Sequence, residues 1–224
     1  MIRQLAFDLP AREAWRREDF FPSPANAAAL AAVDDWRNWP GGKLMLIGPR
    51  GSGKTHLARL WAAETGAALL PAAALPGADL PALSAQGAVA VEDAEAAAGN
   101  PQAEAAFFHL HNLVTQSGHL LVTASRPPRD WPLGLPDLAS RLQSASVARI
   151  EAPDDALLSA VLIKLFADRQ ITVPPTLIPY LVQRMERSID AARALVAALD
   201  ARALAEGRPI TVKLAGDLLG TPSD

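Results

Sequence analysis

The chain has 224 residues with 21 basic and 24 acidic side chains, a net charge of −3, and half of its residues are hydrophobic. This length suits a single domain or a core with a small satellite domain, and the composition excludes a disordered chain. The absence of cysteine excludes disulfides and cysteine zinc sites, and it fits a reducing cytoplasm. No apolar run approaches the roughly 18 residues of a membrane span. The mildly acidic balance argues against avid binding to bare nucleic acid.

An extended arm is predicted for residues 1–22 and an α/β core for residues 23–152. Ser23 followed by Pro24 is typical of a helix start, because the hydroxyl can cap the helix and proline needs no N–H in the first turn. Short apolar runs further along the chain have the length and composition of buried strands. These runs are Lys43–Ile47, Ala67–Leu70, Gly87–Val91, His119–Ala124 and Val147–Ile150.

Two stretches of the sequence differ from this alternating pattern. Residues 71–86 are rich in proline, alanine and glycine and predict no definite element. Beyond Pro153 the apolar residues follow the helical period, so residues 153–224 are predicted to form a helical tail. A brief apolar run at Ile210–Val212 is its one weak strand signal.

A phosphate-binding loop is the strongest motif in the sequence. Gly48-Pro49-Arg50-Gly51-Ser52-Gly53-Lys54-Thr55 fits the pattern G-x-x-x-x-G-K-[ST], and His56 follows it at the start of a predicted helix. In such a loop backbone N–H groups surround phosphate oxygens, the lysine neutralises the β and γ phosphates, and the threonine hydroxyl holds Mg²⁺. This segment therefore predicts nucleotide binding, although it says nothing about hydrolysis.

An acidic pair ends the next confident strand. In Val89-Ala90-Val91-Glu92-Asp93, Glu92 would hold Mg²⁺ through water and Asp93 would orient the water that attacks the γ-phosphate. The magnesium position usually carries aspartate, and the longer Glu92 side chain places its carboxylate differently. The pair therefore predicts a nucleotide site whose own hydrolysis is weak.

Three further residues have a functional and a structural interpretation. Ser125 ends a strand and could sense the γ-phosphate, or it could simply cap the following turn. Arg141 could reach a neighbouring subunit's γ-phosphate, or it could be an ordinary surface arginine. Arg187 lies at a predicted helix start, where the helix dipole disfavours a cation by up to about 1 kcal/mol, so an anion such as a nucleotide phosphate could lie nearby.

Together these motifs occur in the order that AAA+ ATPases show. The stretches SPANAAAL and SRPPRDWPLGLPDLASRL more closely resemble the DnaA/Hda family, and the likeness runs from about Glu18 to Leu219. The resemblance implies an AAA+ P-loop core, with a parallel sheet flanked by helices, followed by a small α-helical lid. It implies ADP or ATP with Mg²⁺ as cofactor, Arg141 as an arginine finger and, less specifically, Asn26 beside the adenine. Ser125 stands where DnaA has aspartate, which again suggests feeble intrinsic hydrolysis.

The N-terminal arm resembles the peptide by which this family engages the DNA polymerase sliding clamp. In Gln4-Leu5-Ala6-Phe7-Asp8-Leu9, alternation places Leu5, Phe7 and Leu9 on one side of an extended backbone. The resemblance implies a bacterial cytoplasmic protein that docks on the clamp, meets DNA only indirectly, and inactivates DnaA by stimulating hydrolysis of its bound ATP.

A second function stays open at this point. A DnaA-like or helicase-loader-like ATPase acting directly on DNA would carry the same core motifs. The length leaves no room for the C-terminal helix-turn-helix domain of DnaA, which favours the regulatory interpretation. Homo-oligomerisation stays open as well, because nothing in the sequence decides it.

Overall fold

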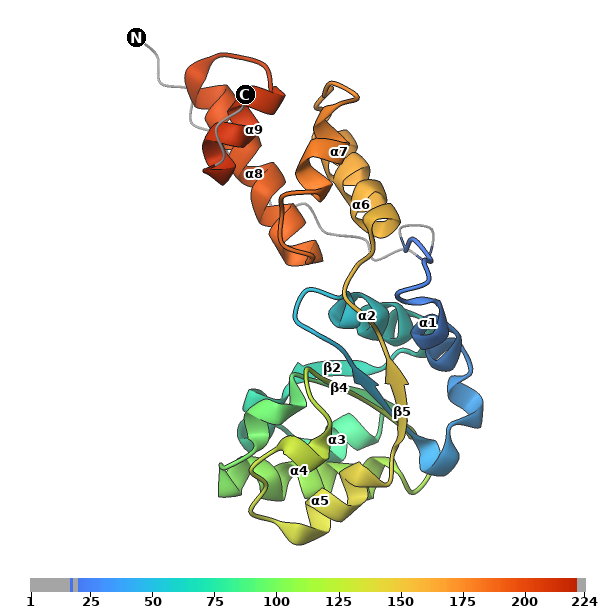
Figure 1. Cartoon of the computed structure of the whole chain (residues 1–224). Helices are drawn as coiled ribbons and strands as arrows, with labels where there is room; N and C mark the ends of the chain where they lie inside the picture. The colour runs from blue at the N-terminus through green and yellow to red at the C-terminus, as the bar shows by residue number, and fades with distance from the viewer. Residues whose placement is uncertain (1–16, 18–19, 221–224) are drawn as a thin grey trace.

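The centre of the molecule is a five-stranded parallel sheet in the order β2-β3-β4-β1-β5. The structure is a computed structural model that describes Arg17 and residues 20–220 (Figure 1). Its strands are β1 (Lys43–Ile47), β2 (Ala68–Pro71), β3 (Ala88–Glu92), β4 (His119–Ala124) and β5 (Ser146–Arg149). Parallel strands need crossover connections and are buried on both faces, which explains why they read as continuous apolar runs. Each predicted strand of the core is confirmed within a residue or two.

Helices cover both faces of the sheet, because alternate strand residues point to opposite sides. Leu44 and Leu46 of β1 pack with α1 and α2, whereas Met45 and Ile47 face the side covered by α4 and α5. The helices of the core are α1 (Ala27–Asp34), α2 (Lys54–Thr65), α3 (Leu80–Ser84), α4 (Pro101–Val114) and α5 (Pro136–Gln143). Within α4, the face formed by Ala103, Phe107, Leu110 and Val114 is buried against the sheet.

The stretch without a sequence signal, residues 71–86, forms short helical pieces. A 3-10 segment at Ala72–Gly77 buries Ala72 and Leu75, and α3 follows it with Asp79 as its N-cap. Five- and six-residue helices are too short to show a period in the sequence, so their burial depends on tertiary contacts.

After β5 the chain forms a helical unit with a hydrophobic core of its own. Its helices are α6 (Asp155–Asp168), α7 (Leu177–Val182), α8 (Ile189–Glu206) and α9 (Val212–Leu219). Residues of α6 such as Leu158, Leu162 and Phe166 pack with α7, α8 and α9 rather than with the sheet. Ile210 is buried in this cluster and Thr211 caps α9, so the weak strand signal there is wrong. None of the helices in the described part of the chain is long and apolar enough to cross a membrane.

Candidate nucleotide-binding site

The glycine-rich loop joins the end of β1 to the start of α2. Gly53 has φ +103° as the N-cap of α2, and Gly51 has φ +69°, which are left-handed conformations that favour glycine. A Cβ on Gly51 would overlap the Ser188 Oγ. The N-cap residue Gly53 has no side chain that could cap α2. The first N–H groups of α2 therefore stay available for an anion, and the helix dipole favours one there.

Lys54 is the first residue of α2 and is only 7% exposed. Its Nζ donates to the carbonyl oxygens of Gly48 and Pro49 at 2.8 and 2.9 Å, so the ammonium lies against the loop. Burial lowers the pKa of Lys54, and the charges of Glu95 and Asp93 oppose that shift. A bound phosphate would supply a better partner than two neutral carbonyls, because its negative charge would add Coulomb attraction to the hydrogen bonds of the ammonium.

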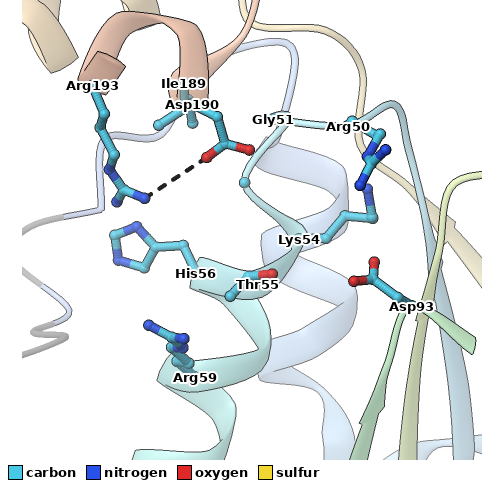
Figure 2. A pocket seen from close by; sticks show the side chains of 11 residues that line it. Arg50, Gly51, Lys54, Thr55, His56, Arg59, Asp93, Ile189, Asp190 and Arg193 are labelled. Atoms are coloured by element: carbon cyan, nitrogen blue, oxygen red, sulfur yellow. Dashed lines mark ion pairs between the residues drawn. The ribbon is translucent and has the colours of Figure 1, made fainter. Parts of the chain in front are cut away.

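The start of α8 packs over the loop, and α8 belongs to the helical unit α6–α9, which is called the lid below. The Ile189 N–H donates to the Gly51 carbonyl at 2.8 Å, while the Ser188 Oγ accepts from the Ala191 N–H and caps α8. The lid helix thus touches the same glycine whose conformation shapes the loop. A pocket forms between the two, lined on the lid side by Ile189, Asp190 and Arg193 (Figure 2).

Cationic side chains dominate the lining of this pocket. Arg50 and Lys54 lie on the loop side, Arg59 on α2 and Arg193 on α8, whereas Asp93 and Asp190 are the acids (Figure 2). An ion pair of 3.9 Å joins Arg193 to Asp190. The excess of positive charge at a helix N-terminus suits a polyanion such as a nucleotide di- or triphosphate.

His56 and Thr55 complete the α2 side of the pocket. The His56 ring packs edge-on against Phe20, with ring centroids 5.3 Å apart. Phe20 belongs to the segment that leads into α1, so that segment reaches the pocket beside the first turn of α2. The structure therefore brings together Lys54, Thr55 and His56, which the sequence predicted, with residues from two distant segments.

At the end of β3, Asp93 rather than Glu92 lines the pocket together with Thr55. Asp93 is in the left-handed region at φ +50°, and its N–H donates to the Thr123 Oγ1 on β4. Glu92 is half-buried, and its Oε1 has no hydrogen-bond partner among the described residues. Hydroxyl and carboxylate oxygens are the ligands that Mg²⁺ prefers, and the buried Glu92 oxygen has an unfilled bonding position. Thr55 and Asp93 therefore fit a magnesium ion that arrives with a nucleotide, whereas Glu92 lies outside the pocket lining and would reach such an ion only through water.

Such an ion would depend on the nucleotide for its other ligands. Among the described residues no group of three or more histidine, aspartate or glutamate side chains could hold a metal by itself. Mg²⁺ commonly binds through one or two carboxylates plus substrate phosphates, which agrees with this arrangement.

Ser125 follows β4, and its N–H donates to the Glu95 Oε1 at 2.8 Å. Glu95 was not predicted to have a role, yet among the charges acting on the pKa of Lys54 it has the largest effect. Glu95 follows Asp93 by two residues, and this short spacing was the only feature of the sequence that could have indicated a role for Glu95 near the nucleotide site. The carboxylate thus connects the end of β4 with the surroundings of the P-loop lysine.

Two predicted pocket residues lie elsewhere. Arg187 donates to the Asp155 Oδ1 at 2.5 Å and to the Pro153 carbonyl at 3.2 Å, so it joins the segment before α8 to the start of the lid. Asn26, only 3% exposed, accepts from the Ser23 N–H and donates to the Phe21 carbonyl. Asn26 therefore shapes the turn before α1 and does not line the pocket. Arg193, to which no motif in the sequence pointed, is the arginine of α8 that does line the pocket.

Arg141 is exposed near the C-terminus of α5, a helix at the end of the core away from the lid (Figure 1). Its carbonyl accepts from the Lys43 Nζ at 2.9 Å, but its guanidinium has no hydrogen bond or ion pair with any described residue. The structure does not bring Arg141 to the pocket of its own chain. The predicted arm residues Gln4, Leu5, Phe7 and Leu9 lie outside the described residues.

Comparison with solved structures identifies the architecture. No protein-family profile matches the chain. Domain III of the replication initiation protein DnaA from Thermotoga maritima superposes with a TM-score of 0.77 at 19% identity, over 95% of this chain and 98% of that one. This chain has the AAA+ fold.

Longer proteins share the same fold. A replication initiator DnaA bound to AMPPCP and single-stranded DNA superposes with a TM-score of 0.67 at 16% identity, over 85% of this chain and 67% of that one. A point variant of Thermotoga maritima RuvB gives 0.64 at 16% identity, over 86% and 65%. The chain therefore spans about two-thirds of the length of these longer AAA+ proteins.

Proposed function

We propose that this chain is a nucleotide-bound regulator of the Hda type, which inactivates the replication initiator DnaA by completing the site that hydrolyses DnaA-bound ATP. The position of Arg141 carries the proposal. Lys43, at the start of β1, holds the backbone of Arg141, whereas the P-loop follows Ile47 at the end of β1. A five-residue strand spans roughly 16 Å, so Arg141 lies too far away to serve the nucleotide of its own chain. An exposed guanidinium in that position is available to a nucleotide on a partner.

Arginine suits this role because its planar fork can pair with two phosphate oxygens at once. Supplied in trans, such a group stabilises the charge of the transition state and raises phosphoryl-transfer rates by roughly 10³–10⁵-fold. The nucleotide of this chain has a different task on this proposal: ADP or ATP between the P-loop and α8 fixes the lid relative to the core. Bound Mg²⁺ would neutralise phosphate charge beside Thr55. Ser125, whose N–H is tied to Glu95, and the unusual Glu92 support slow hydrolysis by this chain itself.

The arm supplies the second half of the proposal, since Gln4, Leu5, Phe7 and Leu9 resemble a sliding-clamp ligand. Each apolar side chain could gain roughly 1.5–3 kcal/mol by burial in a pocket of the clamp. Association costs remove much of that total, so one arm should bind weakly, and two arms on one ring should bind far better through effective concentration. The clamp would thereby bring this chain to DNA indirectly, within the bacterial cytoplasm.

Reconstitution tests the proposal. ATP-loaded DnaA is incubated with the sliding clamp loaded on DNA and with this chain carrying ADP, and conversion of the DnaA-bound ATP to ADP is followed. We expect conversion to accelerate only when all components are present. Unchanged conversion in the complete mixture would contradict the proposed function.

The alternative is an autonomous ATPase that acts directly on DNA. The shared fold with a single-stranded-DNA-bound DnaA and with RuvB favours this second candidate. Brisk ATP turnover by the purified chain, raised by DNA alone and unaffected by Arg141→Ala, would establish it in place of the regulator.

A further inference from the structure

A buried carboxylate holds the loop that leads into α5. Glu104, in the first turn of α4, is 2% exposed. Its Oε1 accepts from the Gly99 N–H at 2.8 Å, and its Oε2 accepts from the Gly134 and Leu135 N–H groups at 2.9 and 2.7 Å. A buried carboxylate is costly unless it is hydrogen-bonded, and three backbone donors satisfy this one. Burial raises the pKa of Glu104, but the bonds from Gly134, Gly99 and Leu135 together outweigh it and leave that pKa below its ordinary value.

Two of these bonds lie directly before α5, so Glu104 affects the position of that helix as well as the packing of α4. Leu135 is the N-cap of α5, and its side chain makes no capping hydrogen bond. Glu104 therefore holds, from another helix, the backbone N–H groups of the two residues that lead into α5. A negative charge at this end of a helix is favourable because the N-terminus carries partial positive charge.

A lysine holds the opposite end of α5. The Lys43 Nζ donates to the Arg141 carbonyl and to the Ser144 Oγ, both at 2.9 Å, and it lies 3.3 Å from the His111 Nε2. Burial first, and then the charge of Lys43, lowers the pKa of His111, so its neutral ring can accept from the ammonium. A cation is favourable at a helix C-terminus, so both ends of α5 are held by a charge of the complementary sign.

Between the two ends, the helix is anchored by apolar packing. Leu138 and Leu142 are buried in the cluster on this face of the sheet. An eight-residue helix is marginal by itself, so its position depends on these external contacts. Arg141 lies on its exposed side, and the carbonyl of the same residue is a hydrogen-bond acceptor of Lys43.

We infer that Glu104 and Lys43 are positioning residues for Arg141, which fix the two ends of α5 so that the guanidinium is presented in one place. This inference rests on the function proposed above. A catalytic group that is displaced by 1 Å can lose about 10²-fold in rate, so a short helix that carries such a group gains from being held at both ends. Neither residue needs to touch the partner's nucleotide.

The test compares Glu104→Gln and Lys43→Met with Glu64→Gln, which changes an exposed glutamate on α2. Only variants whose ADP affinity equals that of wild type are carried forward, and Lys43→Met serves if Glu104→Gln fails to fold. In the reconstituted reaction we expect each variant to lower the maximal rate of DnaA-bound ATP hydrolysis about 10- to 100-fold, as displacement of a catalytic group does. The concentration for half-maximal stimulation should stay unchanged, and Glu64→Gln should behave as wild type.

Two readouts separate positioning from a general structural role. In an Arg141→Ala background, Glu104→Gln should have no further effect on the rate, because it acts only through Arg141. Amide hydrogen exchange at Gly134 and Leu135 should accelerate while that of Met45 in β1 does not. If Glu104→Gln lowers the residual rate of Arg141→Ala by the same factor as it lowers the wild-type rate, or if the maximal rate is unchanged in both Glu104→Gln and Lys43→Met, the inference is overturned.

The same experiment distinguishes failure of the inference from failure of the proposed function. If wild type and Arg141→Ala stimulate hydrolysis equally, the proposed function is wrong and the positioning role falls with it. Faster exchange at Gly134 and Leu135 in Glu104→Gln would then show that Glu104 holds α5 for structural reasons only.

Discussion

The backbone N–H of Ile189, the first residue of α8, donates to the carbonyl of Gly51 in the P-loop at 2.8 Å. This bond joins the lid to the loop that would hold the phosphates, and Ser188 lies against the same glycine. A change in loop conformation on nucleotide binding would therefore be transmitted to α8 directly. Such a transmitted change would give α8 a physical way to report which nucleotide is present.

Gly51→Ala should abolish this junction. The new Cβ would overlap the Ser188 Oγ, and the left-handed φ of +69° is unfavourable for alanine by roughly 1–2 kcal/mol. We expect at least a roughly tenfold loss of ADP affinity, measured by isothermal titration calorimetry. Gly207→Ala is the matched control, because Gly207 has φ +61° but nothing within 4 Å of its Cβ position. Equal ADP affinity in the two variants would contradict a tight lid–loop junction.

The two arginines of the lid that bear on nucleotide binding should behave differently. Arg193 lines the pocket, so Arg193→Ala should weaken ADP binding by roughly 1.5–3 kcal/mol, the worth of a hydrogen bond to a charged group. Arg187 pairs with the exposed Asp155, and exposed pairs contribute about 0–1 kcal/mol, so Arg187→Ala should leave ADP affinity nearly unchanged. Fluorescence titration with a labelled ADP measures both affinities. If Arg187→Ala lost more ADP affinity than Arg193→Ala, Arg187 would contact the nucleotide and this assignment would be wrong.

The buried carboxylate of Glu104 should make the protein sensitive to acid. Its folded pKa lies below the unfolded value of about 4.3, so it stabilises the fold above that pH, and the stabilisation is lost as the pH falls through the lower folded pKa. At pH 7, Glu104→Gln should lower the free energy of unfolding by about 2 kcal/mol. Urea unfolding at a series of pH values should show the gap between wild type and variant narrowing below pH about 4.3. A gap that does not change with pH would show that Glu104 is not ionised in the fold.

The arm prediction can be tested independently of catalysis. Replacing Gln4, Leu5 and Phe7 with alanine should abolish binding to the sliding clamp, because the apolar side chains supply most of the contact energy. ADP binding should be unchanged, since the P-loop lies in a separate part of the chain. Surface plasmon resonance on immobilised clamp measures the first and calorimetry the second. If the triple variant bound the clamp with wild-type affinity, the prediction that the arm binds the clamp would be wrong.

The sequence predicted those parts of the fold that depend on local pattern. The apolar runs of β1, β3 and β4 are readable because a parallel strand is buried on both faces, and the P-loop is readable because its glycines are required by its geometry. Residues 71–86 were not predictable, since helices as short as α3 carry no periodic signal.

The site was less predictable where it depends on how separate elements are placed. The sequence pointed to Arg187 and not to Arg193, and only the docking of Ile189 on Gly51 decides which of the two arginines reaches the pocket. Glu104 reads as a solvated acid in the first turn of a helix, a position where glutamate is common. The loop at Gly134, 30 residues further along the chain, covers Glu104 and donates to it. A local sequence pattern cannot predict such a contact.

The most direct test of the central claim, that Arg141 acts on a nucleotide held by a partner, is single-turnover hydrolysis of DnaA-bound ATP with Arg141→Ala, Arg141→Lys and Arg202→Ala. Arg202 is the matched control, because it lies on α8 in an ion pair with Glu206. We predict that stimulation is lost in Arg141→Ala, is only partly kept in Arg141→Lys because lysine lacks the planar fork, and is unchanged in Arg202→Ala. Clamp and ADP binding should be equal in wild type and all three variants. Full stimulation by Arg141→Ala would contradict the account.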